Sequence, residues 1–418
     1  MTSVVVYPHD LGMGGSQLNA VEIAGGMRDL GHQVIVYGRP GVLCDRITEL
    51  GLEFVASPEP KKRPSPRVIQ DLRRLIRERH IDVVHGYEWP PTLEARLAVM
   101  GTRAVCVSTV MSMAVAPFIP RRVPLVVGTE QIAAVERAAG RRSVSVIEPP
   151  VDVVHNAPGR SDVDVLAFRA EHRIPTGGAH VVCVSRLAHE LKLEGILTAI
   201  DVVPTLGADV TLTIVGDGPA GTVVHAAAAS VNERVGRGAV RVIGQVADPR
   251  PAYDGADIVL GMGGSALRAL AFAKPLVVQG ERGYWRLLTD NALEEFLWTG
   301  WYGVGESADA GPDRLRGILT GLLSDSAERK RLGAYGRDLV CRRFSVEAAV
   351  ARQQRVFEAA VLDGGRLRAA SIIDDGRAAI GFAGHVVRRK ASRLRGTAPT
   401  DDFNAAPIAG RREWERTR

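Results

Sequence analysis

The sequence predicts an α/β protein with two doubly wound, Rossmann-like domains that face each other across a cleft. Short apolar runs typical of buried parallel strands alternate with stretches of helical spacing, and the second half of the chain repeats this plan. The pentapeptide GMGGS occurs at residues 12–16 and again at 261–265, each time between a predicted strand and a predicted helix. A chain of 418 residues is too long for one ordinary core, which favours two domains.

The first domain is expected at residues 1–155. Its predicted strands are SVVVYP, HQVIVYG, LEFVAS, IDVVHG, AVCVST, PLVVGT and SVSVIEPP. The stretches SQLNAVEIAGGMRDLG and PRVIQDLRRLIRERH between them have the apolar spacing of helices. A polar segment, HNAPGRSDVD, then predicts a linker at 156–177.

The second domain is expected at residues 178–344. Its predicted strands are HVVCVS, VTLTIVG, AVRVIG, ADIVLGM and PLVVQG, and its helices include LKLEGILTAIDVVPTLG and GSALRALAFA. A closing amphipathic helix at 345–362 is expected to pack back on the first domain. The remainder, 363–418, is predicted to be a basic, disordered tail, since it holds twelve Lys/Arg against seven Asp/Glu.

Composition limits the function classes. The apolar share of 46% and the charged share of 24% are typical of a soluble globular protein. Most of the net charge of +6 lies in the tail, so the body is nearly neutral and nucleic acid is not an expected partner. Four scattered cysteines without a CxxC pair favour reduced thiols and a cytoplasmic location. We expect neither a signal peptide nor a membrane span.

Glycine turns and cations carry the expected chemistry. A glycine turn at a helix start lets backbone N–H groups approach a phosphate closely, although such a turn is also a common packing feature. Ser16 and Ser265 are expected to cap the helices that follow the two turns. Arg186 and Lys192 follow a predicted strand and could neutralise a departing diphosphate, or could form surface salt bridges instead. Neither glycine turn reads GxGxxG, which argues against a dinucleotide site.

Several segments in the same order together resemble the retaining glycosyltransferases of family 4, which have the GT-B fold. They are YPHDLGMGGSQLNAVEIAGGMRDLGHQVIVY, VIEPPVD, VCVSRLAHELKLEGILTAID, LTIVGDGP, VIGQV, YDGADIVLGMGGSALRALAFAKPLVV and RFSVEAAV. The resemblance covers roughly residues 3–362. It implies a metal-independent hexosyltransferase that moves a sugar from a nucleotide-diphosphate donor to an acceptor hydroxyl with retention. No cofactor is implied, because the nucleotide sugar is a co-substrate.

The resemblance also assigns roles to residues. Arg186 and Lys192 would clamp the diphosphate and, with Asp10 near the acceptor or sugar, would form the catalytic set. Asp10 also fits a purely structural turn. Donor-binding residues would be Gly14, Gly15, Ser16, Gly216, Asp217, Gly244, Gln245, Gly263, Gly264, Ser265 and Arg268.

The acceptor is expected on the first domain, where His85, Tyr87 and Trp89 in DVVHGYEW could shape its surface. A capped strand end is an equal interpretation of these residues. A saccharide, a glycolipid and a small natural product all remain open as acceptors. The basic tail would allow peripheral contact with the inner membrane face. The motif DVD at 162–164 imitates a metal-binding DxD, but it lies in the predicted linker.

Two departures from the family pattern stand out. Relatives often carry a histidine after the strand AVCVST, where this chain has Met111 and Met113. Leu260 and Arg268 occupy the positions of a usual Glu-x7-Glu pair. Arg268 is expected in the first turn of its helix, facing a phosphate or a carboxylate of the donor sugar. The departures keep two alternatives open: a non-catalytic nucleotide-sugar-binding relative and a sugar-nucleotide epimerase on the same fold.

Overall fold

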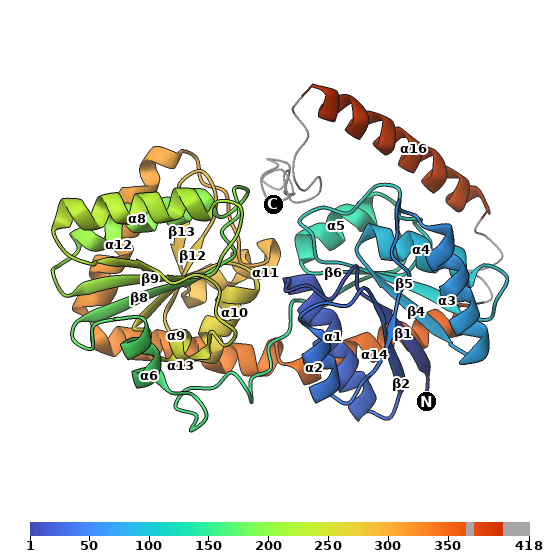
Figure 1. The fold of residues 1–418 in the computed structure, drawn as a ribbon, viewed down its shortest axis with the longest axis horizontal. Helices are drawn as coiled ribbons and strands as arrows, with labels where there is room; N and C mark the ends of the chain where they lie inside the picture. The colour runs from blue at the N-terminus through green and yellow to red at the C-terminus, as the bar shows by residue number, and fades with distance from the viewer. Residues whose placement is uncertain (365–371, 396–418) are drawn as a thin grey trace. The chain divides into compact units, whose positions relative to one another are not determined.

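The computed structural model describes residues 1–364 and 372–395. These residues form two compact units, which are described separately. One comprises Met1–Pro150 with the described residues of 346–364 and 372–395, and the other comprises Val151–Ser345. Figure 1 shows that each unit is a sheet with helices packed around it.

The sheet of the first unit has seven parallel strands in the order β3-β2-β1-β4-β5-β6-β7. Along the central strand β1, Val4 and Val6 join one apolar cluster while Val5 and Tyr7 join another. Both faces of the sheet are therefore buried, as parallel sheets require. The strands are β1 (Ser3–Tyr7), β2 (Gln33–Gly38), β3 (Glu53–Ala56), β4 (Val83–Tyr87), β5 (Val105–Val110), β6 (Leu125–Val127) and β7 (Val144–Val146).

Helices cover both faces of this sheet. One apolar cluster holds residues of α1 and α14, and the other holds residues of α3 and α4. At the contact between α1 and α14, a Cβ added at Gly26 would collide with the Val350 side chain. The helices are α1 (Gly15–Asp29), α2 (Cys44–Glu49), α3 (Pro66–Glu78), α4 (Trp89–Val99), α5 (Glu130–Ala138), α14 (Val346–Leu362) and α16 (Ile372–Leu394).

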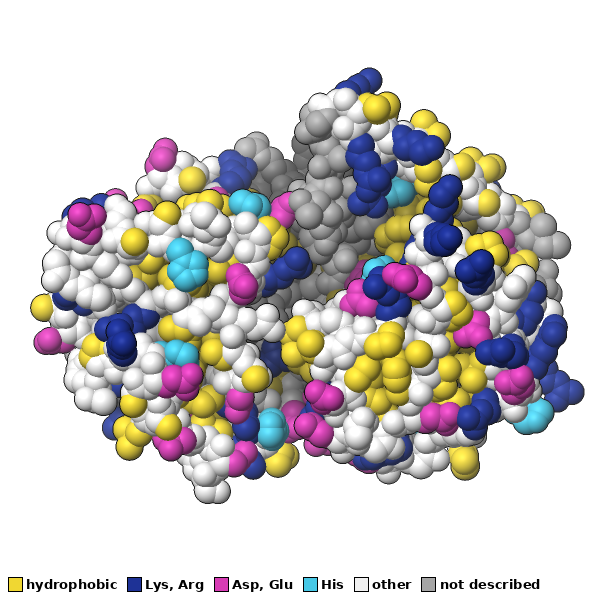
Figure 2. Space-filling model, in the orientation of Figure 1, with side chains coloured by type: hydrophobic (Ala, Val, Ile, Leu, Met, Phe, Trp, Pro, Cys, Tyr) yellow, Lys and Arg dark blue, Asp and Glu magenta, His cyan; other side chains and the backbone are white. Residues whose placement is uncertain are grey.

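The helix α16 corrects the expectation of a disordered tail at 363–418. It packs on the first unit through a two-pronged ion pair, in which Arg96 Nε and Nη2 lie 3.0 and 2.8 Å from the Asp375 carboxylate oxygens. Figure 2 shows dark blue basic and yellow hydrophobic side chains side by side along α16. For Ile372–Leu394 the prediction of disorder was wrong, because the many arginines of this segment concealed its apolar inner face. Residues 365–371 and 396–418 lie outside the described residues.

The sheet of the second unit has the order β10-β9-β8-β11-β12-β13, and β13 runs antiparallel to β12. Its strands are β8 (Ala179–Val184), β9 (Val210–Val215), β10 (Val240–Val242), β11 (Ile258–Gly261), β12 (Leu276–Gln279) and β13 (Trp285–Leu287). Its α-helices are α6 (Val165–Glu171), α7 (Leu193–Val202), α8 (Gly221–Val235), α9 (Arg250–Asp254), α10 (Gly264–Ala271), α11 (Leu293–Thr299), α12 (Gly311–Ser324) and α13 (Ser326–Arg343). Short 3-10 turns are η1 (Val203–Thr205), η2 (Asp290–Ala292) and η3 (Ala308–Ala310).

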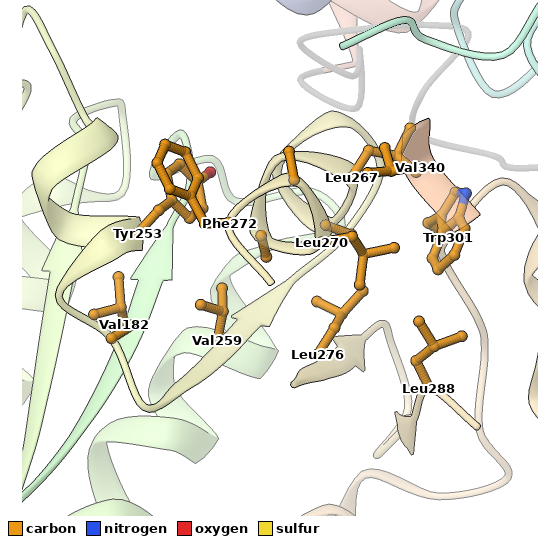
Figure 3. Close-up of a cluster of buried hydrophobic side chains, with 14 of the residues drawn as sticks. Val182, Tyr253, Val259, Leu267, Leu270, Phe272, Leu276, Leu288, Trp301 and Val340 are labelled. Atoms are coloured by element: carbon orange, nitrogen blue, oxygen red, sulfur yellow. The ribbon is translucent and has the colours of Figure 1, made fainter. Parts of the chain in front are cut away.

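An apolar cluster fixes α10, the helix that follows the second GMGGS copy. Figure 3 shows Leu267 and Leu270 of α10 together with Val259 of β11 and Leu276 of β12, all of them buried. The helix therefore has a fixed position against the strand ends, and with it the glycine turn at its start.

The segment 156–177 is part of the second unit and contains the helix α6, so the expected linker is wrong for Val165–Glu171. Phe168 of α6 is 7% exposed and belongs to one of the two apolar clusters of this unit. One apolar residue among many polar ones is a weak sequence signal for a packed helix. Across residues 1–364 and 372–395, no helix is both long enough and apolar enough to span a membrane.

The contact between α1 and α14 gives a stability test. We expect Gly26→Ala to cost about 1–3 kcal/mol of unfolding free energy, because the added methyl overpacks Val350. The matched control is Gly15→Ala in the same helix, where an added Cβ meets nothing within 4 Å. Urea unfolding measures both. If Val350→Ala fails to offset part of the Gly26→Ala loss in the double variant, the two helices do not pack as described.

Candidate functional site

Each sheet has one point where the strand order changes direction, between β1 and β4 in the first unit and between β8 and β11 in the second. In open parallel sheets, ligands bind beyond the carboxyl ends of the strands at such points. The segments that follow these four strands are therefore the candidate sites of the two units.

In the first unit, Asp10 holds the glycine loop that follows β1. Its Oδ1 accepts hydrogen bonds from Gly12 N at 3.0 Å and from Gln17 Nε2 at 3.4 Å, and its Oδ2 lies 3.0 Å from His9 Nδ1. Burial acts to raise the pKa of Asp10, but the bonds from Gly12 and His9 outweigh it and keep that pKa below its usual value. Asp10 is thus an ionised carboxylate that organises the loop.

The two GMGGS copies start their helices at the same point. Gly14 and Gly263 are the N-cap residues, and Gly15 and Gly264 are the first helical residues. The backbone differs, however: Gly14 is extended with φ −152°, whereas Gly263 has φ +55°, a region that favours glycine. The repeat fixes the helix start but not the shape of the turn.

Neither serine of the repeat caps its helix, which corrects the expectation. Ser16 Oγ donates to Glu88 Oε1 at 3.2 Å, and Ser265 Oγ donates to the Met262 carbonyl at 3.0 Å. Neither N-cap residue forms a side-chain capping bond. The helix-start N–H groups of both turns thus lack side-chain caps, which is the state an anion site requires.

The sequence did not lead us to Glu88 as a functional residue, although it lies in the segment DVVHGYEW directly after the strand β4. Besides the Ser16 hydroxyl, its carboxylate accepts Met111 N at 2.8 Å and Ser112 Oγ at 2.9 Å. Its backbone has φ +66°, an uncommon value for a residue other than glycine. One half-buried carboxylate therefore connects the segments after β1, β4 and β5. Met111, one of the two methionines that follow β5, meets Glu88 through its backbone N–H.

The expected acceptor residues His85 and Tyr87 are each 1% exposed, so they do not form an acceptor surface. His85 Nε2 lies 2.6 Å from Thr109 Oγ1, and burial lowers the pKa of this imidazole to about 3. Both residues lie within β4, whose two faces are covered. Trp89 is half-buried and packs against the rings of Phe118 and Phe382.

In the second unit, Arg186 and Lys192 lie between β8 and α7. Arg186 is exposed, and Lys192 is the half-buried N-cap residue of α7. Burial lowers the pKa of the Lys192 ammonium to about 8. Within the part of the chain that the structure describes, neither side chain has a hydrogen bond or an ion pair.

Backbone hydrogen bonds hold the neighbouring loops against this segment. Leu187 N donates to the Asp217 carbonyl at 3.0 Å, and Gly216 N donates to the Gly244 carbonyl at 2.7 Å. Gly216 has φ +138°, and a Cβ there would overlap the Ser185 carbonyl. The loops after β8, β9 and β10 therefore form one connected edge.

The other predicted donor-binding residues on this edge are accessible to solvent. Asp217 and Gln245 are exposed, and a Cβ added at Gly244 would meet nothing within 4 Å. Asp217 Oδ1 accepts Gly218 N at 2.7 Å, so this side chain shapes its own turn.

Arg268 lies in the last turn of the eight-residue helix α10, not in the first turn as expected. A cation is favourable there, so the argument from an opposed helix dipole is wrong. The guanidinium nevertheless bends back toward the glycine turn: its Nη1 is 3.6 Å from where a Gly264 Cβ would stand. Leu260, at the other departing position, is fully buried in β11.

Among residues 1–364 and 372–395, no group of three or more His, Cys, Asp or Glu side chains could hold a metal ion. The DVD motif has structural partners instead. Asp162 pairs with Arg160 and Arg250, and Asp164 Oδ1 caps α6 at Ala167 N.

Comparison with known families identifies the chain. The family model described as "Glycosyltransferase Family 4" matches residues 13–205, and the one described as "Glycosyl transferases group 1" matches residues 178–297. The chain belongs to glycosyltransferase family 4. It is accordingly a nucleotide-sugar-dependent, retaining glycosyltransferase with the GT-B fold.

Solved structures agree on the fold of this glycosyltransferase. A glycosyltransferase from Rickettsia africae has a TM-score of 0.66 at 16% identity, covering 86% of this chain and 98% of the other. HepE of Anabaena in complex with UDP has a TM-score of 0.67 at 15% identity, covering 86% and 100%. A sucrose-phosphate synthase from Thermosynechococcus elongatus has a TM-score of 0.64 at 15% sequence identity, and the match covers 86% of this chain and 99% of the other. No curated protein sequence matches.

The lowered pKa of Lys192 predicts a pH profile. Below pH about 8 the ammonium is charged, and it loses its proton as the pH rises through this value. We expect kcat/KM for the donor to fall above pH about 8, since this parameter reports groups of the free enzyme. In Lys192→Arg the fall should disappear, because a guanidinium keeps its charge. Persistence of the same alkaline fall in the Arg variant would exclude Lys192 as its source.

Proposed function

We propose that the glycosyltransferase takes a hexose from a nucleoside-diphosphate donor held at the carboxyl edge of the second sheet. The observation that carries this proposal is the pair of cations Arg186 and Lys192, which lack side-chain partners in the described chain and lie at the strand-order switch point. HepE was solved with UDP and with UDP-glucose, which makes UDP-glucose the first donor to test.

Arg186 and Lys192 would act on the leaving group. Negative charge grows on the diphosphate as the glycosidic bond to the sugar breaks, and preorganised cations stabilise that charge. The uncapped N–H groups at Gly264 and the Arg268 guanidinium would add donors to the same anion. Gly244 would let the nucleotide approach the backbone, since a Cβ there would meet open space, while Gly216 holds its loop against Ser185. Asp217 and Gln245 would lie at the rim. In this proposal the two cations supply positive charge that a metal supplies elsewhere, so the reaction is metal-independent and needs no cofactor.

The first unit would bind the acceptor hydroxyl, with Glu88 as a positioning residue. Its carboxylate holds Ser16, Met111 and Ser112 together, so the ends of β1, β4 and β5 form a fixed platform. A saccharide, a glycolipid and a small natural product are all compatible acceptors. Asp10 would act through the loop that it organises.

We also propose a cytoplasmic location. Cys106 and Cys183 are buried free thiols, and all four cysteines of the described chain are unpaired. Reduced thiols are typical of that compartment.

Removal of the exposed cation tests the donor site. Arg186→Ala should lower turnover by about 10²–10³-fold, the scale for losing one donor to developing charge, while leaving the melting temperature unchanged. Arg234→Ala, an exposed arginine on α8 of the same unit, is the control and should keep full turnover. Hydrolysis of UDP-, GDP- and dTDP-sugars provides the assay. Undiminished turnover in Arg186→Ala would remove this residue from the mechanism, and interconversion of the donors would favour an epimerase.

Arg268 gives an independent test of the donor's charge. If its guanidinium meets an anion of the donor, Arg268→Ala should weaken donor binding and Arg268→Glu should weaken it further. Isothermal titration calorimetry with UDP-glucose measures both variants. Tighter binding by Arg268→Glu would instead indicate the ribose contact that a carboxylate makes in the usual family pattern.

A further inference from the structure

The helix α16 lies beside the candidate acceptor edge of the first unit. The ring of Trp89, the residue directly after Glu88, lies 5.6 Å from the Phe382 ring and 6.2 Å from the His385 ring. Phe118 contacts the same two rings at 5.4 and 5.0 Å. One face of α16 is therefore fixed on the unit by aromatic packing.

The acidic residues of α16 also face inward. Asp375 pairs with Arg96, and Asp374 Oδ2 accepts Arg122 N at 2.8 Å. These are the two acidic side chains of the described helix. Its outward face is left without negative charge.

That outward face carries an apolar stripe. Ile373, Ile380, Val387 and Leu394 are spaced by seven residues, which places them along one side of a helix. They are 73%, 75%, 67% and 90% exposed. A soluble helix rarely exposes four large aliphatic side chains in a line, so the stripe indicates an interaction surface.

Cations flank the stripe on both sides. Three exposed basic residues of the helix border the stripe, Arg377 and Arg388 on one side and Lys390 on the other, and the exposed Arg395 follows the helix end. The helix has 23 residues, which corresponds to a length of about 34 Å. An apolar stripe bordered by Lys and Arg is typical of helices that lie in a membrane interface.

We propose that α16 binds the surface of an anionic lipid bilayer, with its aliphatic stripe in the acyl boundary and its cations on the lipid phosphates. The charge of this face decides against a second copy of the chain, because two such faces would bring cations together. A coiled-coil seam would also need large apolar residues between the aliphatic ones, where α16 has Gly376 and Ala383. The helix lies on the bilayer and does not cross it.

Binding of the full-length protein to vesicles tests the proposal. Flotation with phosphatidylcholine vesicles that contain phosphatidylglycerol should recover the protein, whereas pure phosphatidylcholine vesicles should leave most of it unbound. Ile380→Asp with Val387→Asp should reduce binding by more than about 10-fold, because two anchoring side chains are lost and two negative charges are added. The control is Leu166→Asp, a 72% exposed leucine on α6, which should bind like the wild type.

If the double aspartate variant does not fold, a less disruptive double variant, Ile380→Ser with Val387→Ser, takes its place in the vesicle assay. Equal vesicle binding by these variants and the wild type would overturn the proposal, as would the absence of wild-type binding to anionic vesicles. Loss of a dimer in the variants, seen by size exclusion, would show self-association instead. Donor hydrolysis without vesicles should stay unchanged in all of them, so this result is separate from the proposed transfer reaction.

Discussion

Parallel strands that lie side by side end at the same edge of their sheet, and every candidate residue depends on this constraint. In the first unit it brings the glycine loop after β1, Glu88 after β4 and Met111 after β5 to one edge. In the second unit it brings Arg186 and Lys192 together with the glycine turns after β9, β10 and β11. The residues are far apart in sequence, and no single helix or loop could collect them.

Hydrogen bonds then make each edge rigid. In the first unit a carboxylate forms the bonds: Glu88 accepts from Ser16 of α1 and from Met111 and Ser112 after β5. In the second unit the backbone forms them, and the strongly positive φ of Gly216 allows the close approach to Ser185. An edge held in this way can keep Arg186 and Lys192 in place without side-chain partners, so that both remain available to an anion.

The sequence predicted the alternation of strands and helices, and it predicted that both GMGGS copies lie between a strand and a helix. It placed the helix caps at Ser16 and Ser265, whereas the N-cap residues are Gly14 and Gly263. It could not predict the different backbone angles of Gly14 and Gly263, because these depend on the strands behind each turn. His85 was misassigned because both faces of a central parallel strand are covered, so alternation does not show which side chains reach the surface. Glu88 could have been recognised in the sequence, because it is a carboxylate residue directly after a predicted strand. Its three partners, however, come from segments that only the fold brings together.

Backbone hydrogen exchange with and without UDP tests most directly that the second sheet's carboxyl edge holds the donor. We expect UDP to slow exchange at the amides of 186–193, 216–218 and 263–266, and to leave the amides of 221–235 in α8 unchanged. Protection should become weaker in Arg186→Ala. If saturating UDP leaves these three segments unprotected, the donor does not bind at this edge and the central claim is wrong.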